Sequence, residues 1–192
     1  MQTSTFQPRF AMTALPDPGL PAPMGPFKGF LFRQVLNFWP CIRGTGGRVT
    51  ELAPDFTRIV VTLKLTWRTR NAVGTIFGGS MMASTDPMLM LMLHRILGKS
   101  YVVWDKSTVT RFKRPATRTL RAEFVLAAQA LSEVRQAVAE RGEADFTWTI
   151  QYKDEAGVVH AEFDKTLYVA RKEFYKAKLA ARAAAAPAPG AA

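Results

Sequence analysis

Residues that bind soft metals or form disulfides are scarce in this chain of 192 residues. It contains one cysteine, Cys41, and two histidines. A single cysteine excludes an internal disulfide, which suits a reducing compartment, and so few soft ligands argue against a zinc site. We therefore expect a cytoplasmic protein that needs no metal and no redox cofactor.

Long hydrophobic runs are also missing. The longest apolar run in the most apolar segment, Met88–Leu93, is far shorter than the roughly 20 residues that a membrane span requires. The first residues do not combine a basic stretch with an apolar one, so we expect no signal peptide. Membrane insertion is not expected.

Basic residues outnumber acidic ones. The chain has 26 Lys and Arg against 15 Asp and Glu, a formal net charge of +11. Such a surface attracts polyanions: nucleic acid, an acidic membrane, or a phosphorylated cofactor such as coenzyme A. A solvated basic surface without any such partner fits the charge equally well. We do not expect nucleic acid, because the aromatic residues lie within predicted strands rather than between the cations, as a single-strand platform requires.

The composition divides the chain into three parts. Residues 1–29 contain six prolines and little periodicity, which is typical of an extended arm. Residues 30–171 show helical and strand periodicity and form one predicted domain. Residues 172–192 are rich in alanine, and we expect a short helix from Lys172 that frays toward the end.

The hydrophobic periodicity predicts an α+β domain. The break at Asp154–Gly157 predicts a hairpin turn. Helices are predicted at 30–38, 78–97 and 132–141, and the second of these is apolar on all sides and therefore buried. Strands are predicted at 48–52, 58–66, 101–112, 118–128, 145–153 and 158–171. One buried helix followed by four strands is an α+β arrangement.

The segment from Asn71 to Asp86, NAVGTIFGGSMMASTD, carries the most informative pattern. Gly78 and Gly79 let the backbone turn tightly before the predicted helix. The first amides of a helix lack partners inside it and lie at the positive end of its dipole, so they can hold a developing oxyanion. Asp86 follows about two helical turns later.

The sequence leaves two interpretations of Asp86 open. A carboxylate in an apolar stretch could act as a general base or as a nucleophile. Asp before Pro87 is also a good N-cap for a separate helix 87–97, in which case Asp86 has only a structural role. Asn71 is a further candidate catalytic residue, although holding its turn through side-chain-to-backbone bonds is the favoured role.

At these residues the chain resembles the hotdog-fold thioesterases, in particular the phenylacetate-pathway type. The matching residues are Asn71, Gly74, Gly78, Gly79 and Asp86. Phe77 occupies a position where that family usually has histidine. The chain is more similar to a bacterial hotdog family described as a domain of unknown function, through FGG at 77–79, DP at 86–87 and YVVWDK at 101–106. The resemblance covers residues 30–171.

The resemblance implies a hotdog fold, an antiparallel sheet wrapped around a long central helix, in a homodimer or a dimer of dimers. It implies an acyl-CoA thioesterase in which the amides of Gly78 and Gly79 polarise the thioester carbonyl and Asp86 is the base or nucleophile. Coenzyme A then enters as part of the substrate. A noncatalytic acyl-CoA or fatty-acyl binding protein is the alternative, favoured by Phe77 and by Met90, which replaces a polar residue near the acid.

A basic segment is the predicted binding site for the phosphates of coenzyme A, because Arg forks match phosphate oxygens. Its cations are Arg111, Lys113, Arg114, Arg118 and Arg121, with no acidic residue between them. A solvated hairpin end explains the same cluster equally well. Phe77 is expected to contact the substrate beside the helix start. Trp104 and Lys106 lie on one face of a predicted strand and Asp105 on the other. Charged groups in a central strand need partners, which an intersubunit contact or a pocket wall would supply.

Overall fold

The computed structural model of the chain describes residues 20–185. Within this range, five helices accompany one antiparallel sheet of six strands. The helices are α1 (Pro26–Phe38), α2 (Pro40–Thr45), α3 (Gly78–Leu97), α4 (Ala128–Arg141) and α5 (Lys172–Ala185). The strands are β1 (Gly47–Leu52), β2 (Arg58–Leu63), β3 (Tyr101–Phe112), β4 (Leu120–Val125), β5 (Glu143–Lys153) and β6 (Val159–Arg171). This is the predicted α+β class.

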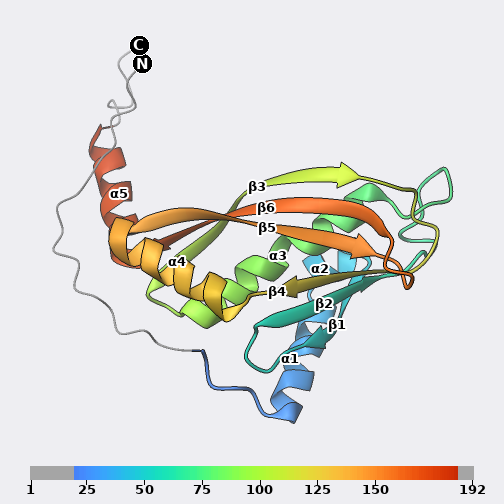
Figure 1. Cartoon of the computed structure of the whole chain (residues 1–192), viewed down its shortest axis with the longest axis horizontal. Coiled ribbons are helices and arrows are strands. Elements are labelled where there is room, and N and C mark those ends of the chain that lie inside the picture. The colour runs from blue at the N-terminus through green and yellow to red at the C-terminus, as the bar shows by residue number, and fades with distance from the viewer. Residues whose placement is uncertain (1–19, 186–192) are drawn as a thin grey trace.

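The sheet has the strand order β1-β2-β4-β5-β6-β3. Figure 1 shows that it curves over α3, which lies along its inner face. The hairpin between β5 and β6 closes through a bond from the Gly157 amide to the Asp154 carbonyl, as the sequence predicts. A sheet that wraps one long helix is the hotdog arrangement that the resemblance implies.

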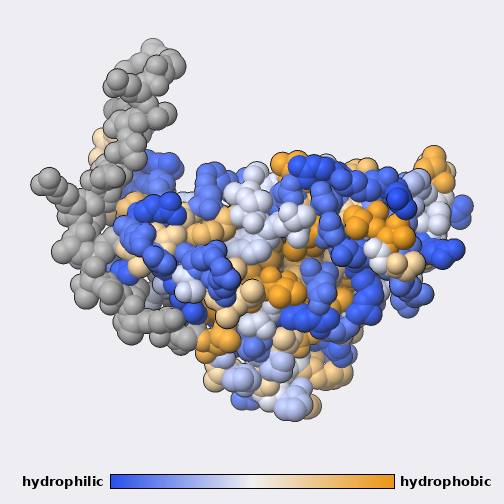
Figure 2. Space-filling model, in the orientation of Figure 1, coloured by the Kyte–Doolittle hydropathy of each residue, from blue (hydrophilic) through white to orange (hydrophobic). Residues whose placement is uncertain are grey.

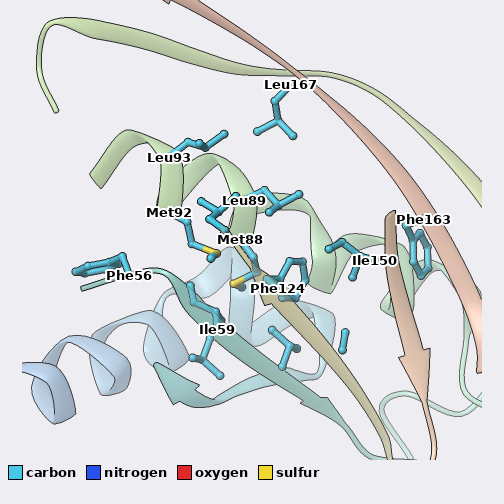
Figure 3. Packing of buried hydrophobic residues seen from close by; sticks show 14 of the residues in the cluster. Phe56, Ile59, Met88, Leu89, Met92, Leu93, Phe124, Ile150, Phe163 and Leu167 are labelled. Carbon is cyan, nitrogen blue, oxygen red and sulfur yellow. The ribbon is translucent and has the colours of Figure 1, made fainter. Parts of the chain in front are cut away.

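Only one side of helix α3 is buried, where it meets the sheet, whereas Met82 and Asp86 on another side are exposed, so the prediction of a helix buried on all sides is wrong. Four of its residues, on successive turns, are fully shielded from solvent: Met88, Leu89, Met92 and Leu93. Figure 3 shows them among side chains from several strands, including Ile59, Phe124, Ile150, Phe163 and Leu167. Each such side chain contributes about 1.5–3 kcal/mol when fully buried. The core therefore fixes where α3 lies and where it presents its polar residues.

Pro87 lies inside α3, which runs without a break from Gly78 to Leu97. The alternative in which Asp86 caps a separate helix 87–97 is therefore wrong. Proline removes one helical hydrogen bond, but the burial of the flanking turns holds the helix together. Asp86 is an interior residue of α3, and its side chain needs another explanation.

Several element boundaries differ from the prediction. Helix α1 begins at Pro26, within the predicted arm, because proline at the first helical position is well suited to start a helix. Helix α4 begins at Ala128 rather than Ser132, since its buried side already includes Leu131. Strand β2 ends at Leu63 and β4 spans only Leu120–Val125, shorter than predicted. Helix α5 begins at Lys172 as expected, whereas residues 1–19 and 186–192 lie outside the described range.

The two edge strands of the sheet differ in whether another element hydrogen-bonds to them. At the β1 edge, the buried side chain of Asn37 in α1 bonds both backbone groups of Val49, at 2.9 Å to the carbonyl and 2.8 Å from the amide. At the other edge, β3 pairs only with β6 in the described range and exposes Trp104, Val109 and Phe112. A long bare edge with apolar side chains is a surface for pairing with another strand.

The outer face of the sheet is polar where β5 and β6 meet. Cross-strand bonds join Thr147 to Thr166 at 2.8 Å and Thr149 to Asp164 at 2.7 Å. Figure 2 shows hydrophilic and hydrophobic residues interspersed over the face turned to the viewer. Within residues 20–185, no helix combines the length and apolarity that crossing a bilayer demands.

Candidate functional site

The loop before α3 is held by Asn71. Its Oδ1 accepts bonds from the amides of Val73 at 3.2 Å and Thr75 at 2.9 Å, and its Nδ2 donates to the Thr75 hydroxyl at 2.8 Å. Gly74 in the same turn has a φ of 84°, a conformation that favours glycine. The polar atoms of Asn71 are thus engaged within the turn, which agrees with its predicted structural role.

Among residues 20–185, no hydrogen-bond acceptor is found for the amides of Gly78 and Gly79 at the start of α3. Phe77 is the N-cap residue and makes no side-chain cap. The amides of Ser80 and Met81 both donate to the Phe77 carbonyl, at 3.0 and 3.3 Å. The amides of Gly78 and Gly79 come before these, in the first turn, where helical amides have no intrahelical acceptor. They are the candidate oxyanion donors.

Glycine at 78 and 79 leaves room for two aromatic rings rather than making a turn. Neither residue has a positive φ, so the predicted tight turn is not the reason for the pair. A Cβ on Gly78 would lie 2.7 Å from the Phe112 ring, and one on Gly79 would lie 2.3 Å from the Phe77 ring. Two half-exposed aromatic rings therefore flank the helix start, with Phe112 lining a groove beside it and Phe77 outside that lining.

A groove beside this helix start, the helix-start groove, has a volume of about 650 Å³. Its lining includes Asn71, Thr75, Gly78, Met81, Phe112, Lys113 and Arg114. The loop that carries the two cations is fixed by His160, whose carbonyl accepts from both of their amides, at 2.8 and 3.2 Å. The buried His160 ring also contacts the Pro115 carbonyl at 3.0 Å. Sequence reasoning missed this support, since it joins residues far apart in the chain.

The structure separates the members of the predicted phosphate site. Arg111 is bonded to Asp164 at 2.5 Å, and the Asp164 carboxylate raises the pKa of the Arg111 guanidinium. Lys113 lies 3.8 Å from Glu162. No carboxylate of the described residues forms an ion pair with Arg114 or Arg118. Arg111 therefore belongs to the outer face of the sheet, and Arg114 is the groove cation with the most available charge.

Asp86 lines a second groove, the Asp86 groove, of about 500 Å³. Its lining is Cys41, Thr45, Met82, Ala83, Asp86, Pro87 and Thr108. The Asp86 side chain is 66% exposed, so the carboxylate is accessible from the groove. It is held from below by a lysine that the sequence analysis did not single out, Lys165 of β6.

Lys165 is fully buried beneath Asp86. Its Nζ lies 2.9 Å from the Asp86 carbonyl, 3.1 Å from Asp86 Oδ1 and 3.0 Å from Asp105 Oδ1. Asp105 thus has the partner that its inward position required. Burial raises the pKa of the Asp105 carboxyl, the Lys165 ammonium opposes that rise, and the Asp86 carboxylate adds to it.

The sequence does contain a signal for Lys165. Alternation along β6 places it on the same face as Phe163 and Leu167, both fully buried. A lysine between two core positions of a strand needs a buried acidic partner. That partner could not be named from one sequence, because Asp86 and Asp105 reach it from other elements.

The helix start and Asp86 are not brought together within one chain. Eight residues of helix separate Gly78 from Asp86, a rise of about 12 Å. Neither groove contains both residues. One copy of the chain therefore presents the amides and the carboxylate as two separate sites.

A family comparison identifies the chain. Residues 29–169 match the family described as Domain of unknown function (DUF4442). The chain belongs to the DUF4442 family. This agrees with the resemblance seen at 77–79, 86–87 and 101–106. No curated protein matches this sequence.

Solved structures show that this DUF4442 protein has a hotdog fold. A Pseudomonas aeruginosa protein of unknown function, described as a probable thioesterase, matches with a TM-score of 0.65 and 22% identity over 74% of this chain and 95% of its own. A Haemophilus influenzae thioesterase matches with a TM-score of 0.54 and 16% identity, covering 73% and 88%. A Chlorobaculum tepidum protein of unknown function has a TM-score of 0.57 and 15% identity, covering 76% and 95%. At these identities the similarity establishes the fold.

Proposed function

We propose that the protein hydrolyses an acyl-CoA thioester at a site shared between two copies of the chain. The amides of Gly78 and Gly79 from one copy polarise the thioester carbonyl. Asp86 from the other copy takes a proton from water, whose oxygen bonds to the acyl carbon. The carbon–sulfur bond then breaks and coenzyme A leaves as the thiolate, which takes up the proton. The alternative role of Asp86 is direct attack, which gives an anhydride that water then cleaves.

The observation that carries this proposal is the division of chemistry between two grooves on one helix. The helix-start groove supplies hydrogen-bond donors for an oxyanion but no acid. The Asp86 groove supplies an accessible carboxylate but no free amide pair. Reacting atoms must approach within about 3–3.5 Å. A carbonyl bound to the Gly78 amide is too far from its own Asp86 for direct attack.

The bare edge of β3 provides the route by which a second copy completes each site. Thr108 of β3 lines the Asp86 groove, and Phe112, four residues on, lines the helix-start groove. Antiparallel pairing of β3 with β3 of a second copy reverses this order. The Phe112 end of one copy then approaches the Thr108 end of the other, and a twofold axis makes both sites equivalent.

The nucleotide end of the substrate would lie along the loop at 113–118. Lys113 and Arg114 line the helix-start groove, and Arg118 follows on the same exposed loop. Phosphate oxygens attract such cations more strongly than an uncharged acyl group does. The acyl chain would lie against Phe77 and Phe112, which flank the glycine pair.

A thiol-release screen tests this function. Short-chain, long-chain and aromatic acyl-CoAs are each incubated with the wild-type protein and with Asp86→Asn. We expect release of thiol from at least one class, and none above background with the variant. Equal turnover by both proteins would contradict the assignment of Asp86. A monomeric mass by light scattering at micromolar concentration would contradict the shared site.

A noncatalytic acyl-CoA binding protein is the second candidate. Two residues favour it: Phe77 cannot donate a hydrogen bond at the helix start, and Met90, one turn after Asp86, offers no hydroxyl to hold a water. Calorimetric titration with a nonhydrolysable acyl-CoA analogue separates the two functions. Binding without thiol release from any tested acyl-CoA would favour the second candidate.

A further inference from the structure

We propose that Lys165, anchored by Asp105, is the positioning residue that holds the Asp86 carboxylate toward its groove. The inference rests on the proposed function, because it assigns a role to Asp86. Lys165 lines neither the helix-start groove nor the Asp86 groove. It would act only through Asp86, from behind the helix.

The contacts of Lys165 fix two parts of the same residue. Its ammonium donates to the Asp86 carbonyl at 2.9 Å and to Asp86 Oδ1 at 3.1 Å. One bond locates the helix backbone and the other selects the side-chain rotamer. Within residues 20–185, only Oδ1 of the carboxylate is held in this way. The second oxygen therefore remains available to the Asp86 groove.

Asp105 has the matching role for the lysine. It lies at a bulge in β3, where the pairing with β6 shifts between Asp105 and Ser107. Alternation from the buried Tyr101 and Val103 places Asp105 on the inner face, and its Oδ1 lies 3.0 Å from Lys165 Nζ. Bulges re-aim side chains and are frequent next to active sites. Asp105 of β3, Lys165 of β6 and Asp86 of α3 thus form a row of ion pairs that ends at the exposed Asp86 carboxylate.

A role in stability alone explains this arrangement poorly. A buried ion pair gains little net stability over well-packed apolar residues, because its desolvation cost is large. Phe163 and Leu167, on either side of Lys165, show that an apolar residue suits this face of β6. Apolar residues at 105 and 165 would fill the same space, but they could not orient Asp86.

The test replaces both buried charges at once. Lys165→Met keeps the length of the side chain, and Asp105→Asn removes the charge that Lys165→Met would leave unpaired. We expect the double variant to melt near the wild-type temperature, with kcat lower by about 10²-fold, as for a misplaced catalytic group, and KM unchanged. Asp105→Asn alone should lower kcat less. Arg58→Met, which breaks ion pairs with Glu51 and Glu123 and lines neither groove, is the control and should keep wild-type kcat.

A crystal structure of the folded variant separates this inference from the proposed function. We expect Asp86 to leave its wild-type rotamer when Lys165 no longer holds it, whether or not any thioester is cleaved. Asp86 unmoved in the double variant, or wild-type kcat with both charges removed, would overturn the positioning role. Absence of thiol release by the wild-type protein would overturn the thioesterase function and leave the structural result to decide this one. If the double variant does not fold, the same two readouts are taken from Asp105→Asn.

Discussion

The two grooves along α3 differ in charge and in how the chain builds them. The helix-start groove offers neutral amide donors and cations, and most of its lining comes from two short stretches, 71–81 and 112–116. The Asp86 groove offers one carboxylate, and its lining comes from α2, α3 and β3, with Lys165 of β6 beneath. The donors of the helix-start groove suit an oxyanion, and the carboxylate of the Asp86 groove suits a general base. In the proposed function, a complete site needs one groove of each kind, from two copies of the chain.

Asp86→Asn should have the largest effect, because it removes the only carboxylate of the two grooves. We expect kcat to fall by about 10²–10⁴-fold, the range of general-base catalysis. The melting temperature should stay close to that of the wild-type protein, since the side chain is exposed and is not a helix cap. Steady-state kinetics and a thermal melt on the same preparation check both parts. Full turnover by the variant would remove Asp86 from the mechanism.

Gly78→Pro should have the next largest effect, since it deletes one amide donor without ending the helix. Proline is tolerated at the first helical position, and Phe77 before it already has an extended conformation, with φ −63° and ψ 127°. We expect kcat to fall by about 10²–10³-fold, as for loss of one oxyanion donor.

Gly78→Ala is the control for Gly78→Pro. It adds a Cβ against the same Phe112 ring but keeps the amide. If kcat falls equally in both variants, crowding of Phe112 explains the loss, and the amide is not an oxyanion donor. A fall confined to proline supports the donor role.

Arg114→Ala with Arg118→Ala should have a smaller effect, confined to KM. Contacts to phosphates far from the scissile bond provide binding that is equal in ground and transition states, so we expect KM for acyl-CoA to rise about tenfold with kcat unchanged. High salt should mimic the change. Arg111→Ala is the contrast, because its charge is paired with Asp164, and KM should change less. If KM rises more for Arg111→Ala than for the Arg114 and Arg118 variant, the phosphates bind at the sheet surface and not in the helix-start groove.

Asn71→Ala should have the smallest effect on catalysis. The variant loses bonds that hold the turn at 71–75, which we expect to lower the free energy of unfolding by about 1 kcal/mol. kcat should change little, because no polar atom of Asn71 is free for substrate. Denaturant unfolding and kinetics measure the two quantities. A kcat loss as large as that of Asp86→Asn would make Asn71 part of the reaction.

The contrast between the grooves also explains what the sequence could predict. The helix 78–97 and the turn held by Asn71 depend on residues close in sequence, and they are predicted correctly, whereas the role of the amides at the helix start stays a prediction. The reason for Gly78 and Gly79 is not predicted correctly, because Phe112 approaches from a strand more than thirty residues away. Lys165 and His160 act through contacts between distant strands and loops. Alternation alone marks Lys165 as buried but does not name its partners.

The predicted phosphate-binding segment also depends on contacts with residues distant in the sequence. Five nearby cations in the sequence suggested one site, but Arg111 pairs with Asp164, Lys113 lies near Glu162, and Arg121 pairs with Glu51 of β1. Charge density along the chain therefore overestimates the charge available to a ligand. The register of β3 against β6 decides which cations remain available.

Mixing two inactive variants tests the shared site most directly. Gly78→Pro and Asp86→Asn chains, carrying different tags, are co-expressed, and thiol release is measured on the mixture. In a twofold dimer each mixed pair has one complete site, so random assembly should recover about one quarter of wild-type turnover, and the doubly tagged fraction about one half. Each variant alone should stay inactive. No recovery in the doubly tagged dimer would show that the amides and the carboxylate of one chain work together, contrary to the shared site.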